Sequence, residues 1–151
     1  MAGAADEAPA TRSVPVLPLL GVVVGLWGAL PRFVDTGLLT EDGVEFVDHV
    51  VPGVVVVLVS VVSLAVARRS PKPGPFLFVA GLVVLLAGLF MFATHVPLVM
   101  QATRDEAPWG GTVFHTSSAL AVFGLGLLWA TAYWSATAPE PGADAEVAEN
   151  R

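Results

Sequence analysis

The chain of 151 residues contains no cysteine and no isoleucine, one lysine, and only 13% charged residues. The absence of cysteine excludes disulfides, thiolate metal sites, iron–sulfur clusters and the covalent attachment of c-type haem. Any metal ion or haem must therefore be held by histidine or carboxylate side chains. The formal net charge of −6 leaves no basic patch for a phosphate backbone, so the composition argues against nucleic-acid binding.

Long apolar stretches dominate what is present, since 55% of the residues are hydrophobic and the mean hydropathy is +0.76. A hydrocarbon core about 30 Å thick is crossed by a helix of roughly 20 apolar residues. Such a helix pairs its own backbone groups where no water is available. The sequence therefore predicts an all-α fold, an integral membrane four-helix bundle. Its helices are expected at about residues 16–34, 46–67, 76–100 and 113–134.

Composition also divides the chain into a domain and two tails. Residues 14–135 hold the four apolar stretches, and segments 1–13 and 136–151 are rich in alanine, proline, glycine and acidic residues. Such segments cannot bury enough apolar surface to fold, so both tails are predicted to be disordered.

The basic residues predict an orientation in the membrane. Arg68, Arg69 and Lys72 lie in the connection between the second and third helices, and short loops rich in lysine and arginine stay on the cytoplasmic side. The N and C termini are then cytoplasmic as well. The apolar run at 16–34 does not end in a small-x-small cleavage site, which favours a retained helix over a signal peptide. We expect a multi-pass protein of the cell membrane, in contact with the lipid bilayer.

Small and aromatic residues give two further expectations. Gly21 and Gly25 lie one turn apart and are predicted to let the first helix approach a neighbour closely. Trp129 lies near the end of the fourth helix with other aromatic residues, which is typical of a belt at the membrane surface. Pro52, early in the second helix, is predicted to distort it.

The candidate site consists of the three histidines of the chain. His49 lies early in the second helix, His95 late in the third and His115 early in the fourth. In the predicted topology all three fall in the outer leaflet, at depths that agree to within about 5 Å. Ionisable groups inside a bilayer usually face the interior of the bundle, so the rings can converge on one site. The alternative is three separate interfacial histidines bonded to loop carbonyls.

Neighbouring charges support a site. Glu45 is four residues before His49 on the same helical face, where a carboxylate can orient an imidazole that binds a metal. Arg32 and Arg104 are the only basic residues on the predicted outer side, and each can bind a propionate, a quinone oxygen or a carboxylate. A metal site of His49, His95 and His115 would suit zinc or copper.

One half of a haem A synthase resembles this layout. The segment Glu45-Phe46-Val47-Asp48-His49 opens the second helix, and His115 opens the fourth. Members of that family have a Glu-x-x-His-Arg pattern at the start of the second helix. Here the glutamate and histidine are four apart, and Val50 follows the histidine. The resemblance implies His49 and His115 as axial ligands of haem b and Glu45 as the nearby acid, and it implies no enzyme activity.

The sequence ranks three functions. The first is a small non-catalytic membrane protein, an accessory subunit of a larger membrane complex, because no combination of nucleophile, base and oxyanion donor is present. The second is a redox protein linked to haem or quinone. The third is a protein that handles or transports metal ions as a homo-oligomer, since four helices alone lack the inverted repeats of larger carriers.

Overall fold

The computed structural model describes residues 15–35, 46–70 and 72–134, apart from the side chains of residues 30–35. Every element in these ranges is helical, so the predicted all-α fold is confirmed for this part of the chain. The elements are α1 (Val16–Asp35), the π-helical turn η1 (Phe46–Val50), α3 (Val51–Arg69), α4 (Gly74–Thr103) and α5 (Trp109–Trp134). The two predicted tails and Glu45 lie outside the described residues.

Three segments are long and apolar enough to cross a membrane. They are η1 together with α3, then α4, and then α5. Helix α1 has 20 residues. Its side chains are described only as far as Ala29, and the apolar run Val16–Ala29 is shorter than the other three segments. The positions of all four helices agree with the hydropathy pattern, because that pattern depends only on the length of each apolar run.

The connection between α4 and α5 is shorter than the sequence predicts, because α4 continues to Thr103 and α5 already begins at Trp109. Helix α4 ends in a Schellman motif. The amide of Glu106 donates to the carbonyl of Gln101 at 2.9 Å, and the amide of Asp105 donates to the carbonyl of Ala102 at 3.2 Å. Asp105 adopts the left-handed conformation that this motif requires, with a φ of 59°. Hydrogen bonding at the end of the helix, which hydropathy does not report, sets this boundary.

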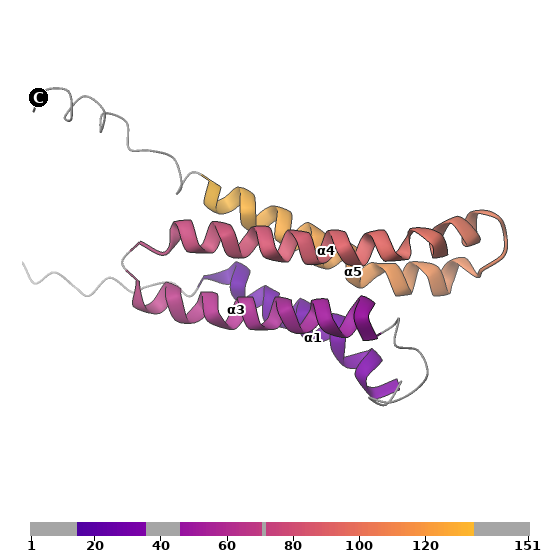
Figure 1. Ribbon diagram of the computed structural model, residues 1–151, viewed down its shortest axis with the longest axis horizontal. Helices are drawn as coiled ribbons and strands as arrows, with labels where there is room; N and C mark the ends of the chain where they lie inside the picture. Colours follow the sequence, from indigo (N-terminus) through magenta and orange to yellow (C-terminus); the bar gives the residue numbers. More distant parts are fainter. Residues whose placement is uncertain (1–14, 36–45, 71, 135–151) are drawn as a thin grey trace, which may run out of the picture.

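The helices run alternately up and down, as Figure 1 shows. Helix α4 packs mainly against α5, and α1 mainly against α3; α3 and α4 join the two pairs, and α1 also contacts α5. The connection from α4 to α5 and the start of α3 lie at the same end of the bundle (Figure 1). Residues from η1, α4 and α5 can therefore meet at that end.

Glycines bring the backbones of both helix pairs into direct contact. A Cβ atom placed on Gly25 of α1 would lie 2.9 Å from the carbonyl oxygen of Gly53 in α3. In the other pair, a Cβ on Gly81 of α4 would lie 2.6 Å from the amide nitrogen of Ala130 in α5. The predicted packing role of Gly25 is confirmed, and the α4–α5 contact adds glycines that the sequence did not single out.

The core lies where the four helices meet and includes Val56, Val84, Met91 and Trp129. Trp129 is fully buried, so its predicted place in an interfacial belt is wrong: it fills the space that small residues leave between the helices. Large apolar side chains cover the outside of the bundle, among them Leu58 and Leu86. A soluble protein of this size seldom exposes such a continuous apolar surface.

Candidate metal centre

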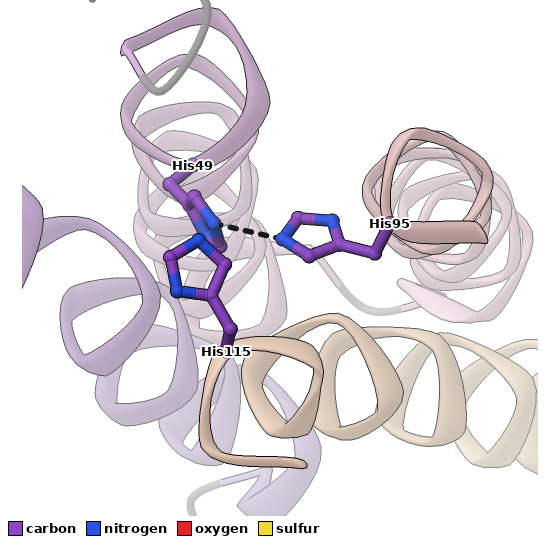
Figure 2. Close-up of side chains that lie close together, drawn as sticks. All are labelled: His49, His95 and His115. Carbon is purple, nitrogen blue, oxygen red and sulfur yellow. Dashed lines mark hydrogen bonds between the residues drawn. The ribbon is translucent and has the colours of Figure 1, made fainter. Parts of the chain in front are cut away.

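Three elements deliver the three histidines to one end of the bundle. His49 lies in η1, His95 in the last third of α4, and His115 in the second turn of α5. His49 and His95 are buried, with 2% and 4% of their surface exposed, and His115 is partly buried. Figure 2 shows the rings pointing toward one another from their separate helices.

The π-helical turn that carries His49 has a local cause. Pro52 occupies the first turn of α3, and proline has no N–H to donate to the carbonyl four residues before it. A wider turn, in which the N–H five residues on is the donor, lets a helix continue past such a position, and turns of this kind are frequent at functional sites. The predicted distortion of the helix near Pro52 is therefore present as a π-helical turn, and this turn holds His49.

The distances between the rings are short. The Nε2 atoms of His49 and His95 lie 3.0 Å apart. The ring centroids are separated by 4.7 Å for His49 and His95, 5.0 Å for His49 and His115, and 5.3 Å for His95 and His115. One nitrogen atom from each ring can be chosen so that all three lie within 4.8 Å of one another. The expected convergence of the three histidines is confirmed by these distances.

The backbone of α4 fixes the tautomer of His95. Its Nδ1 atom lies 2.6 Å from the carbonyl oxygen of Met91, and a carbonyl only accepts, so Nδ1 carries the proton. The hydroxyl of Thr94 donates to the same carbonyl at 2.8 Å and lies 3.2 Å from Nδ1. In the neutral ring Nε2 then holds a lone pair, and this lone pair is directed at His49. A metal-binding histidine typically bonds its second ring nitrogen in this way.

The polar side chains of the first turns of α5 bond to their own helix. Thr112 donates to the carbonyl of Pro108 at 3.1 Å, Thr116 to that of Thr112, and Ser118 to that of His115 at 3.4 Å. Back-bonding of this kind satisfies a hydroxyl without a partner on another helix. Among these residues it is the imidazole of His115 that reaches across to the other helices.

The arrangement fits a single metal ion. A tetrahedral ion with metal–nitrogen bonds of about 2.0–2.1 Å holds its nitrogen ligands roughly 3.3–3.5 Å apart. The three donor atoms span a range that includes this separation, so small rotations of the side chains bring them onto one ion. The donor set contains three imidazoles and, within the described ranges, no carboxylate. Imidazole donors suit zinc, copper, iron and nickel.

Ligation of one haem by two of these imidazoles does not fit the observed ring arrangement. It requires two imidazoles on opposite faces of a porphyrin, with a flat cavity between them. Here the rings of His49 and His115 are in edge contact, with centroids 5.0 Å apart, where a porphyrin would have to lie. The cavity beside His49 and His115 has a volume of about 30 Å³, whereas pockets for ligands of drug size have about 300–1,000 Å³.

The other predicted site residues are Arg104, Glu45 and Arg32. Arg104 is the C-cap of α4, where it is exposed. Glu45 lies outside the described residues. Arg32 belongs to α1, but its side chain is not among those described. Their predicted roles stay predictions.

Sequence reasoning missed the groups that surround the rings. The carbonyl of Met91 orients His95. The two residues are four apart on one helix, and this spacing could have indicated the contact. Gly28 and Ser118 line the cavity beside His49 and His115, and nothing in their spacing indicates this.

Comparisons of the chain with protein-family models, with curated proteins and with solved structures gave no match. The resemblance to a haem A synthase therefore stays a prediction.

Proposed function

We propose that this chain is a multi-pass integral membrane protein that binds one zinc or copper ion through His49, His95 and His115. The observation that carries the proposal is that three imidazoles from three helical elements bring one nitrogen atom each to within 4.8 Å of one another. Buried ring nitrogens need partners, and a metal ion held by all three imidazoles would supply one to each ring. The sequence alone ranks an accessory subunit first, and the proximity of the rings favours a metal-handling protein instead.

The preset tautomer of His95 supports the same proposal. Because its Nδ1 proton is held by the carbonyl of Met91, its Nε2 lone pair is the acceptor for His49 Nε2 at 3.0 Å. A metal ion that bound both Nε2 atoms would take the place of the proton between them, and His49 would stay neutral by carrying its proton on Nδ1 instead. Binding then requires little reorganisation of α4, since the second bond of His95 is already made.

The location that we propose is the cell membrane, with both termini in the cytoplasm and the metal centre near the outer face. The support is the length of the apolar helices and the position of Arg68, Arg69 and Lys72 at the end of the bundle opposite to the histidines. A single cysteine at Glu106 should react with an impermeant maleimide in intact cells, and one at Ser70 should react only after lysis. The reverse pattern would place the metal centre on the cytoplasmic side.

Metal binding is tested with the purified protein in detergent. Titration with Cu²⁺ should reach one equivalent per chain, and the electron paramagnetic resonance spectrum should show coupling to three imidazole nitrogens. Zn²⁺ in excess should compete for the same site. Because the chain has no cysteine, thiolate binding does not complicate the titration.

Matched variants separate the site from adventitious binding. His95→Gln keeps the size and polarity of the side chain but removes the ligand nitrogen, so copper affinity should fall by about 10–100-fold or more. Arg104→Ala, at the same end of the bundle but outside the histidine group, should bind copper like the wild type. Equal binding by His95→Gln and the wild type would refute the proposed site.

A further inference from the structure

We propose that the metal centre keeps one coordination position open, and that a cavity between α1 and α5 delivers a small anion or a water molecule to that position. This inference rests on the proposed metal-binding function. It adds that the site is reactive toward an external ligand. A centre that only stabilises the fold is closed by four protein ligands, whereas a centre that acts on a ligand has three protein ligands and one exchangeable position.

The first observation is the number of ligands. The group of donor atoms holds three imidazoles and no fourth histidine or acid within the residues that the structure places. Zinc in proteins is almost always four-coordinate, and copper(II) prefers four or more ligands. A fourth ligand must come from outside the group.

The second observation is the position of the cavity. It has a volume of about 30 Å³ and is lined by His49 and His115 together with Gly28, two serines, Ser117 and Ser118, and two aromatic residues, Trp27 and Phe114. Two of the three proposed ligands thus form its wall. A space of about 10–15 Å³ on this measure holds one water molecule, so the cavity takes one or two small molecules. An ion held by the three rings would therefore border a space of the right size for one more ligand.

The cavity also reaches the surface of the bundle. Trp27 of α1 is 44% exposed and Phe114 of α5 is 70% exposed, and both line the cavity. We place the entrance of the cavity between these two exposed side chains. In the proposed topology this entrance lies near the outer headgroup region, where water and small ions are available.

Charge favours an anionic ligand. Three neutral imidazoles leave a divalent ion with its full double charge, and burying such a charge in a medium of low dielectric constant is costly. A hydroxide or another small monoanion halves the charge. Ser118 can stabilise that ligand, because its bond to the carbonyl of His115 is long, at 3.4 Å, and a hydroxyl can turn to a better partner.

Gly28 offers a way to fill the cavity without disturbing the fold. A Cβ atom at Gly28 would lie 3.9 Å from Cε of Met91 and 4.0 Å from Cβ of Ser118, which are ordinary contact distances. Gly28→Ala therefore fits without displacing a neighbour, and Gly28→Val places two further methyl groups beside the cavity. Gly124→Ala on α5 is the matched control, because a Cβ there meets no atom within 4 Å.

The experiment uses the full chain loaded with Cu²⁺ and titrated with azide. The wild type should develop a saturable azide-to-copper charge-transfer band. The azide affinity of Gly28→Val should be at least about tenfold lower than that of the wild type, as expected when methyl groups fill a small pocket. The azide affinity of Gly28→Ala should lie between those of Gly28→Val and the wild type. Both variants should keep the copper stoichiometry and the nitrogen coupling of the wild type, and Gly124→Ala should match the wild type in every respect.

Two results would overturn the inference and leave the metal site standing. One is a copper-loaded wild type that gives no azide band, which means a closed coordination shell. The other is equal azide affinity in Gly28→Val and the wild type, which means that the ligand enters elsewhere. If the wild type binds no copper at all, the proposed function and this inference both fail.

Discussion

Replacement of Gly88 by alanine should push α4 and α5 apart and weaken metal binding at the proposed centre. A Cβ atom at Gly88 would lie 2.5 Å from Cα of Phe123 and 2.8 Å from the carbonyl carbon of Val122. Ordinary contacts of this kind begin at 3.4 Å, and both neighbours are backbone atoms that cannot rotate away. The two helices must therefore separate locally by at least about 0.9 Å, the difference between 3.4 and 2.5 Å, and the amide nitrogen of Phe123 lies closer still.

The energetic cost follows from a comparison with Gly124→Ala. Both substitutions gain helix propensity, about 1 kcal/mol each, but only Gly88→Ala meets a neighbour. The difference between the two variants isolates the cost of overpacking, about 1–3 kcal/mol. For a domain of this size that cost should lower the melting temperature of Gly88→Ala by on the order of 5–10 °C relative to Gly124→Ala.

Tryptophan fluorescence of the detergent-solubilised protein is a suitable assay, because the fully buried Trp129 reports the opening of the bundle. A second readout is copper affinity. His95 follows Gly88 by two helical turns, roughly 10 Å along α4, so a shift between the helices moves His95 relative to His115. Equal melting temperatures and equal copper affinities in the two variants would refute the close approach of α4 and α5 at Gly88.

Three further outcomes are expected. Gly25→Leu should lower the melting temperature more than Val23→Leu. A Cβ atom at Gly25 would lie 2.9 Å from the backbone of Gly53, whereas Val23 is 58% exposed. Equal effects of the two substitutions would place Gly25 on the outside of the bundle. Copper affinity should fall steeply from about pH 7 to pH 5, since protons compete for the imidazoles, and a flat profile in equilibrium titrations would argue against histidine ligands. Ser63→Ala should leave the melting temperature unchanged or raise it. The Ser63 hydroxyl is buried and has no hydrogen-bond partner in the described part of the chain. A clear loss of stability would contradict this and indicate that the hydroxyl has a partner.

The sequence predicts the helices and their order well because both depend on local properties. An apolar run of sufficient length must form a helix in lipid, whatever its neighbours are. The rise per residue then fixes the depth of each side chain, which is why His49, His95 and His115 are expected at one end. The restriction to histidine or carboxylate ligands also follows from the sequence, because the chain has no cysteine.

Only the tertiary structure decides which way each side chain points around its helix axis. Rotation and neighbourhood follow from the packing of glycines such as Gly81 and Gly88, which let α4 and α5 touch and turn His95 and His115 toward the same space. The same packing buries Trp129, although its position near a helix end is typical of an interfacial residue. The depth of a histidine along its helix depends on one segment of the sequence. The approach of three histidines to within bonding distance depends on how several helices pack together, so it cannot be predicted from any one segment.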